Sequence, residues 1–196
     1  MPEADSEKPT RIWVIGDSGQ PGEISLAVRD AMLNWIDENP RTDNEYINLW
    51  LSLGDMAYRS GTNEQFQAAL FDTYPDILRN QSLWPVYGNH DARRWTYFKL
   101  FTLPEEGEAG GVASGTENYY SIDYANIHLV MLDTTDSDLD QGSEMLEWLK
   151  NDLSLNTRQW LIAAFHHPPY SKGTHDSDRR KDSAARMHKV RENVLP

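Results

Sequence analysis

Four short polar motifs in this sequence each follow a hydrophobic run, and their side chains could bind metal ions. The motifs are Gly-Asp-Ser-Gly at residues 16–19, Gly-Asp-Met-Ala-Tyr at 54–58, Gly-Asn-His-Asp at 88–91 and Phe-His-His-Pro-Pro at 165–169. Together they offer carboxylate, phenol, amide and imidazole donors, which suit hard or borderline cations. Two such ions about 3.5–4 Å apart form the arrangement used for in-line displacement at phosphorus. The donor set therefore predicts a two-metal phosphoesterase site.

The hydrophobic runs before these motifs predict buried strands, so that each motif begins where a strand ends. The expected strands cover residues 11–15, 48–53, 83–87 and 159–165. Apolar residues at helical spacing predict a helix over 24–39, and a second helix is expected over 63–74. Strands that alternate with helices predict an α/β layered sheet, in which ligands gather at the carboxyl ends of the strands.

The second half of the chain continues the alternation. Residues 119–123 and 127–133 predict an antiparallel hairpin, and Ser143 is the expected N-cap of the next helix. The Gly- and Glu-rich residues 105–115 are expected to form an exposed loop, and residues 184–195 a short helix. We expect a polar N-terminal segment, 1–10, and one catalytic domain, 11–196.

Composition limits the classes of partner. The chain has 196 residues, a formal net charge of -13 and no cysteine. The acidic balance argues against nucleic acid or an anionic membrane as a partner, because basic patches usually hold both. No run of about 18 uncharged apolar residues is present, so no membrane span is expected. Without cysteine, disulfides and thiolate ligands are excluded, while the cellular compartment stays open.

In this order the motifs resemble those of the calcineurin-like metallophosphoesterases, and more narrowly those of the purple acid phosphatases. Most members of the wider family carry Asp-x-His in the first motif, whereas Gly19 stands at that place here and Tyr58 follows the second aspartate. That exchange is typical of purple acid phosphatases. The resemblance implies a layered β-sandwich flanked by helices, an αββα arrangement, incomplete at the C terminus.

The resemblance also implies a ligand set. Asp17, Asp55 and Tyr58 would bind Fe(III), and Asp55 would bridge to a second ion, which is Zn(II), Mn(II) or Fe(II). Asn89 and His166 would bind that second ion. A phenol with an ordinary pKa near 10 becomes a good ligand only beside a strong Lewis acid, which agrees with ferric iron.

The family pattern ends in Gly-His-x-His, which supplies one further histidine to each ion, and this sequence contains no such motif. We therefore expect the chain to be a fragment of a longer domain, with metal weakly held or absent in this form. Full activity of the chain without any extension would contradict this expectation.

By the same resemblance, a hydroxide held by the two ions would attack phosphorus. A leaving alkoxide then needs a proton, and His90 is the first choice as its donor. Asp91 could orient the His90 ring, and His175 is the second donor that would face the substrate. Because the donor must be protonated, we expect an acidic to neutral pH optimum.

The resemblance implies an acid phosphatase acting on phosphomonoesters, with a phosphorylated small molecule or peptide as the substrate. A phosphodiesterase of the same superfamily and an inactive phosphatase fold that acts as a binding module stay open as alternatives. A serine esterase using Ser18 is a remote alternative, since the aspartate that should precede its histidine is replaced by Ala163 or Ala164. The related enzymes are often exported, which favours a periplasmic or secreted location, and the oligomeric state is left open.

Several cations lie near the motifs in sequence and could contact a phosphate or simply form a solvated basic face. They are Arg93, Arg94, Lys172, Arg179, Arg180 and Lys181.

Overall fold

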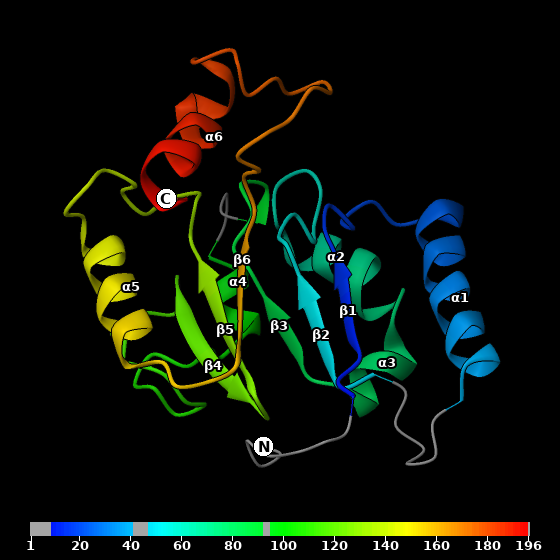
Figure 1. Ribbon diagram of the computed structural model, residues 1–196. Coiled ribbons are helices and arrows are strands. Elements are labelled where there is room, and N and C mark those ends of the chain that lie inside the picture. Colours follow the sequence, from blue (N-terminus) through cyan, green and yellow to red (C-terminus); the bar gives the residue numbers. More distant parts are fainter. Residues whose placement is uncertain (1–8, 41–46, 92–94, 196) are drawn as a thin grey trace. The chain divides into compact units, whose positions relative to one another are not determined.

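The computed structural model describes residues 9–40, 47–91 and 95–195. The described residues form two compact units, one ending at Leu100 and the other beginning at Phe101. Each unit contains a three-stranded sheet with its own helices (Figure 1). The two are called the N-terminal and the C-terminal unit below.

The N-terminal unit is built on a parallel sheet with the strand order β1-β2-β3. The strands are β1 (Ile12–Ile15), β2 (Leu49–Ser52) and β3 (Leu83–Pro85). The helices are α1 (Glu23–Glu38), α2 (Asn63–Phe66), which continues into a π-helical turn (Gln67–Phe71), α3 (Pro75–Asn80) and α4 (Tyr97–Leu100). Since the strands are parallel, their carboxyl ends lie at the same end of the sheet, and the first three motifs begin there.

Aromatic side chains hold this sheet together. Trp13 of β1 stacks on Trp50 of β2 with ring centroids 4.9 Å apart, and the edge of Tyr74 meets both rings at 5.7 and 5.2 Å. All four residues of β2 are buried, as expected for the central strand of a parallel sheet. Helix α2 begins at a capping box in which Thr62 accepts from the backbone of Gln65.

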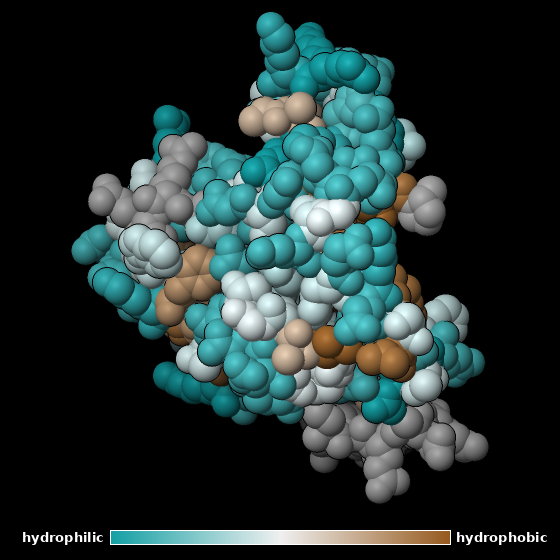
Figure 2. Space-filling view, turned by 90° about the vertical axis from the view of Figure 1, so that its left-hand side faces the viewer, coloured by the Kyte–Doolittle hydropathy of each residue, from teal (hydrophilic) through white to brown (hydrophobic). Residues whose placement is uncertain are grey.

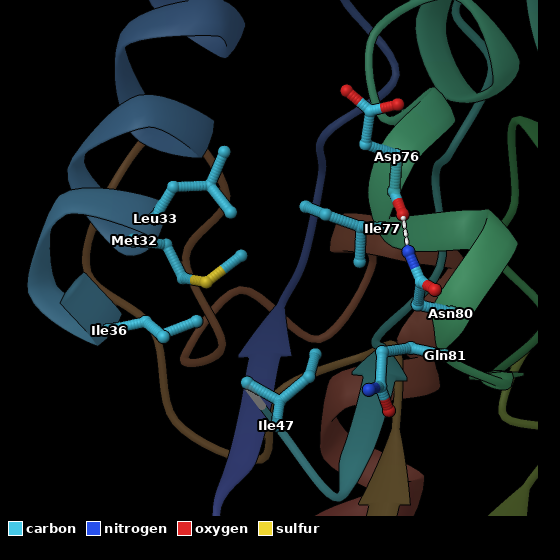
Figure 3. A pocket seen from close by; sticks show the side chains of 8 residues that line it. All are labelled: Met32, Leu33, Ile36, Ile47, Asp76, Ile77, Asn80 and Gln81. Atoms are coloured by element: carbon cyan, nitrogen blue, oxygen red, sulfur yellow. Dashed lines mark hydrogen bonds between the residues drawn. The ribbon is translucent and has the colours of Figure 1, made fainter. Parts of the chain in front are cut away.

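Between α1 and α3 the packing leaves an apolar cavity of about 150 Å³ (Figure 3). Met32, Leu33 and Ile36 of α1 line one side of the cavity, and Ile77 of α3 lines the other. The cavity lies away from the four motifs in sequence, and none of its lining residues belongs to them.

The C-terminal unit is built on a mixed sheet with the order β4-β5-β6. Strands β4 (Tyr120–Tyr124) and β5 (Ile127–Leu132) form an antiparallel hairpin, and β6 (Trp160–Phe165) pairs with β5 in parallel. The helices are α5 (Glu144–Leu155) and α6 (Arg186–Lys189), which continues into a π-helical turn (Val190–Val194). Val130, Leu132, Leu146, Trp148 and Val190 join strands and helices in one core. Seen from the side of α5, hydrophilic residues cover most of the surface (Figure 2).

The predicted α/β fold with two sheets and flanking helices is confirmed. Two expected elements differ from the structure. The helix expected over 63–74 is interrupted by the π-helical turn, with a new helix at Pro75. The helix expected over 184–195 begins two residues later, at Arg186, because Ala184 and Ala185 have positive φ angles, and it continues through the π-helical turn to Val194.

Three of the sequence-based expectations stay predictions. These are the packing of the two sheets into a sandwich, the single domain over 11–196, and the polar segment 1–10, most of which lies outside the described residues. In the described part of the chain, no helix is both long and apolar enough to cross a membrane.

Candidate metal centre

Two aspartates of the N-terminal unit occupy equivalent positions just beyond neighbouring strands. Asp17 follows β1 and Asp55 follows β2, and each comes directly after a glycine. Both have left-handed backbone conformations, with φ angles of 53° and 55°. Such conformations cost on the order of 1 kcal/mol for residues other than glycine and often occur at functional sites. One carboxylate oxygen of Asp17 lies within 4.8 Å of one of Asp55, a spacing at which a cation between them would relieve their repulsion.

The phenol of Tyr58 completes this group of oxygens. Its hydroxyl donates a hydrogen bond to Asp17 Oδ1 at 2.8 Å. Burial, the hydrogen bond to Asp17 and the charge of Asp55 together raise the pKa of Tyr58 far above its ordinary value. The phenol proton therefore lies between two oxygens, where a sufficiently strong Lewis acid could replace it.

Backbone hydrogen bonds fasten the first motif to the second. The Gly19 N–H donates to the Asp55 carbonyl at 2.9 Å, and the Tyr58 N–H donates to the Gly19 carbonyl at 3.0 Å. A Cβ atom at position 19 would lie 2.5 Å from the backbone nitrogen of Ala57. Because no side chain fits there, the local packing explains why glycine occupies the place where the wider family carries a histidine.

The third motif approaches the second from β3. A Cβ atom at Gly88 would lie 2.1 Å from the backbone nitrogen of Asp55 and 2.5 Å from its Oδ1. The His90 N–H donates to the same Oδ1 at 2.7 Å. Asn89 stands between Gly88 and His90 in the sequence and is partly buried. Its role as a metal ligand stays a prediction.

The expectation that Asp91 orients the His90 ring is wrong. Asp91 is fully buried, and its carboxylate accepts backbone hydrogen bonds from Met56, Ala57 and Gly88. Burial and the charge of Asp55 raise the pKa of Asp91 to about 7. The Asp91 carboxylate thus binds the backbone of the loop that carries Asp55 and fixes that loop.

The His90 ring is oriented by a backbone carbonyl. Its Nδ1 lies 2.9 Å from the Arg59 carbonyl oxygen, which can only accept, so Nδ1 carries a proton. Its Nε2 lies 3.9 Å from Asp55 Oδ2, and the ring is partly exposed. No sequence signal marks this carbonyl, because any residue type supplies one.

In the C-terminal unit, His166 comes one residue after β6 and is partly buried. The next residue, His167, is buried, and its ring Nδ1 lies 3.1 Å from Thr134 Oγ1. The backbone N–H of His167 donates to the same oxygen at 3.0 Å. Burial, with the nearby charges of His166 and Arg186, lowers the pKa of His167 to about 3. His167 is therefore a neutral anchor for the loop, and Thr134 is a contributor that the sequence did not reveal.

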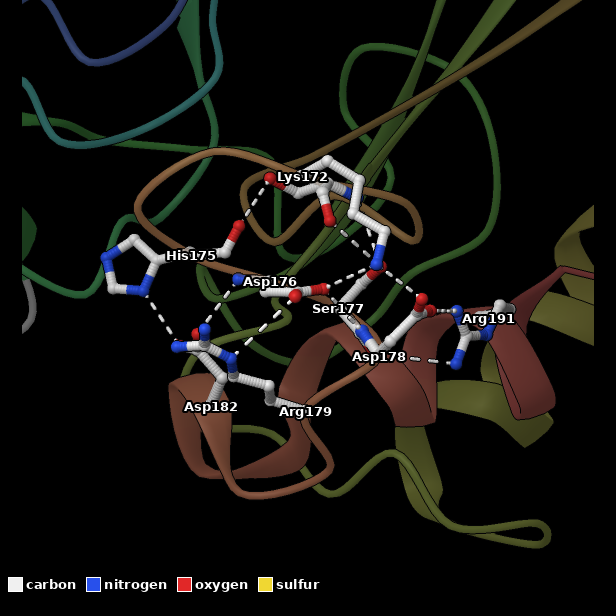
Figure 4. Close-up of polar contacts among 9 residues, drawn as sticks. Lys172, His175, Asp176, Ser177, Asp178, Arg179, Asp182 and Arg191 are labelled. Carbon is white, nitrogen blue, oxygen red and sulfur yellow. Dashed lines mark hydrogen bonds and ion pairs between the residues drawn. The ribbon is translucent and has the colours of Figure 1, made fainter.

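His175 belongs to a polar loop of the same unit (Figure 4). Its Nδ1 lies 2.8 Å from Asp182 Oδ1, and Asp182 also accepts from the Asp176 N–H at 2.9 Å. The backbone hydrogen bond from Asp176 and the contact with His175 lower the pKa of Asp182 to about 2. The exposed His175 ring is thus tethered through one nitrogen.

Three of the six basic residues singled out in sequence have acidic or histidine partners in this unit. Lys172 pairs with Asp176 and Asp178 at 3.1 and 2.5 Å. Arg179 pairs with Asp176 at 3.7 Å, and Arg180 contacts His188 at 2.9 Å. Arg93 and Arg94 lie outside the described residues.

The geometry gives no support to a serine nucleophile. In the described part of the chain, the Ser18 hydroxyl has no hydrogen bond to a histidine. A serine esterase needs such a contact to activate its nucleophile.

Comparison with known proteins agrees with the donor set. The model of the calcineurin-like phosphoesterase family matches residues 10–192. The chain belongs to the calcineurin-like phosphoesterase family. This membership covers both units and all four motifs.

Within the family, the chain is similar to purple acid phosphatases of Arabidopsis thaliana. It is 26% identical to "Probable purple acid phosphatase 20" over 97% of this chain and 43% of that protein. It is 29% identical to "Purple acid phosphatase 15" over 86% of this chain and 35% of that protein. The chain therefore spans less than half the length of the curated relatives that it matches.

Proposed function

We propose that this chain carries most of the metal ligands and the proton donors of a dimetal phosphomonoesterase of the purple acid phosphatase type. The observation that carries the proposal is the convergence of Asp17, Asp55 and Tyr58 at the ends of β1 and β2. Family membership and the similarity to purple acid phosphatases support it. Asp17, Asp55 and Tyr58 would hold Fe(III), while Asn89 and His166 would bind a second divalent ion.

The donor chemistry fits such ions. Two carboxylates and a phenol are hard oxygen donors, and they suit ferric iron better than a soft metal. When bound, the two ions supply Lewis acidity at phosphorus and neutralise charge on the phosphoryl oxygens.

The remaining chemistry falls to the side chains around this centre. His90 holds a proton on Nδ1 through the Arg59 carbonyl, which leaves Nε2 as the atom that can give a proton to the leaving oxygen. His175, tethered through Nδ1 to Asp182, would offer a second Nε2 to the substrate. The histidine that donates must carry a proton on both ring nitrogens, so the rate should fall at alkaline pH.

The proposal is tested first by spectroscopy of the ferric protein. A phenolate bound to Fe(III) gives a visible charge-transfer band, which Tyr58→Phe should remove. Tyr170→Phe is the matched control, since Tyr170 is 69% exposed and lies outside the metal motifs. A band that survives Tyr58→Phe would contradict the proposed ligand, whether or not Tyr170→Phe removes it.

Turnover then separates the reaction classes. The metal-loaded chain is assayed with an aryl phosphate monoester and with the matching diester. Faster hydrolysis of the monoester is expected, and Asp55→Asn should abolish it. Preference for the diester would favour the phosphodiesterase alternative, and metal binding without any turnover would favour a binding module.

A further inference from the structure

A buried ion network in the C-terminal unit takes no part in the proposed chemistry. At its centre is His128 of β5, which is 2% exposed. Its Nδ1 lies 2.7 Å from Asp123 Oδ1 of β4, and its Nε2 lies 2.7 Å from Asp152 Oδ2 of α5. Both ring nitrogens thus face carboxylates from different elements.

This geometry defines the charge of the ring. A carboxylate oxygen only accepts hydrogen bonds, so both ring nitrogens must donate and His128 must be an imidazolium. Arg158 contacts Asp123 Oδ2 with Nε at 3.0 Å and with a second guanidinium nitrogen at 2.9 Å. The network then contains two cations and two anions, and their charges cancel.

The acid–base balance of the network agrees with this assignment. Burial opposes the charged form of His128, but the hydrogen bonds and charges of Asp152 and Asp123 outweigh it and raise its pKa. Burial raises the pKa of Asp152, but hydrogen bonds from His128, Val112 and Ser121 outweigh it and lower that pKa.

The network joins segments that are far apart in sequence. Asp152 Oδ1 accepts from the Val112 N–H at 2.9 Å and from Ser121 Oγ at 2.8 Å. A Cβ atom at Gly111 would lie 2.0 Å from that Ser121 oxygen, so the loop packs tightly against β4. Helix α5, the β4–β5 hairpin and the loop around Gly111 therefore meet at one charged ring.

We propose that this network makes the packing of the C-terminal unit depend on pH. The doubly protonated His128 ring holds the loop around Gly111 and helix α5 to the β4–β5 hairpin, and loss of one ring proton at higher pH weakens these contacts. A neutral imidazole has only one N–H, so one buried carboxylate would then face a lone pair. Such a buried, unpaired charge is costly.

The direction in which stability changes with pH follows from the raised pKa of His128. A histidine with a raised pKa in the folded state contributes stability that is fully present below its unfolded value of about 6.5 and is lost as the pH passes its folded value. The charged groups that face His128 or its partners are Asp123 on β4, Asp152 on α5 and Arg158 after α5. On β6, the residue that pairs with His128 is the uncharged Leu161.

Titration of the intact chain by NMR with ¹⁵N-labelled histidine tests the proposal. We expect the midpoint of His128 to lie above that of an ordinary histidine, with both ring nitrogens protonated below it. Asp123→Asn removes the negative charge beside Nδ1 and should move the midpoint to lower pH. Arg158→Gln removes the competing cation and should move it to higher pH. His188→Gln, in α6, assigns one signal and should leave the His128 midpoint unchanged.

The two variants should shift the His128 midpoint in opposite directions. General structural damage would not raise the midpoint in one variant and lower it in the other, so the pair of shifts distinguishes the proposed role from such damage. If Asp123→Asn fails to fold, Arg158→Gln still tests the proposal. An ordinary or lowered midpoint in the unaltered chain, or no change in Arg158→Gln, would overturn it.

Hydrogen exchange supplies the second readout. The protection factor of the Val112 amide should fall as the pH passes the His128 midpoint, because its acceptor is Asp152. The Leu53 amide, which donates to the Ile15 carbonyl in the other unit, is the control and should keep its protection factor. A constant protection factor at Val112 across the titration would also overturn the proposal.

Discussion

Replacing Gly88 by alanine tests how closely β3 approaches the candidate metal centre. The added Cβ atom would lie 2.1 Å from the Asp55 backbone nitrogen and 2.5 Å from its carboxylate, whereas ordinary contacts begin at 3.4 Å. One of the two backbones must therefore move by about 1 Å. Gly173→Ala is the matched control, because a Cβ atom there meets nothing within 4 Å.

The expected cost has two sources. Overpacking a tight backbone contact costs about 1–3 kcal/mol. The shift also weakens the hydrogen bond from the His90 N–H to Asp55, and such a bond to a charged group contributes about 1.5–3 kcal/mol. Because that bond need not be lost completely, we expect a destabilisation of about 2–5 kcal/mol.

Urea unfolding followed by tryptophan fluorescence measures this effect. With a slope of about 2 kcal/mol per molar urea, the midpoint should fall by about 1–2.5 M. Gly173→Ala should stay within about 0.5 kcal/mol of the unaltered chain. Equal midpoints for the two variants would refute the close approach of Gly88 to Asp55.

Two further predictions concern the C-terminal unit. Ala184→Gly should stabilise the protein by about 0.5–1 kcal/mol, because Ala184 is exposed and has a φ of 52°, a conformation that glycine adopts without strain. Ala27→Gly, in the middle of α1, is its control in thermal unfolding and should destabilise by about 1 kcal/mol, so equal effects of the two changes would contradict the assignment. Asp133→Ala should cost about 2–4 kcal/mol, because the buried carboxylate accepts from the backbone of Thr135, Asp136 and Ser137. Faster hydrogen exchange confined to residues 135–137 is the expected local sign of Asp133→Ala, and unchanged exchange there would count against it.

Much of the fold could be predicted because the elements have strong local patterns. The β-branched and aromatic run at 11–15 and the helical apolar spacing at 24–39 gave β1 and α1 within one residue at each end. The C-terminal helix was predicted, but its first residue was not. Ala184 and Ala185 are good helix formers by residue type, yet both have left-handed conformations in the structure.

Part of the candidate metal site could likewise be predicted from the sequence, and part could not. The residue types of Asp17, Asp55 and Tyr58 and their positions after strands were visible in the sequence, because parallel strands deliver their ends to one edge. The partners of Asp91 and of the His90 ring were not visible. Backbone amides and a backbone carbonyl supply them, and neither depends on residue type.

The sequence by itself determined the donor atoms, their order along the chain and the α/β alternation that groups the first three motifs. Only the tertiary structure decided that Gly19 and Gly88 are required by backbone contacts, and that His128 is enclosed by carboxylates from β4 and α5. The physical reason is that residue type and spacing fix local chemistry and periodicity. Contacts between distant segments depend instead on how the elements pack.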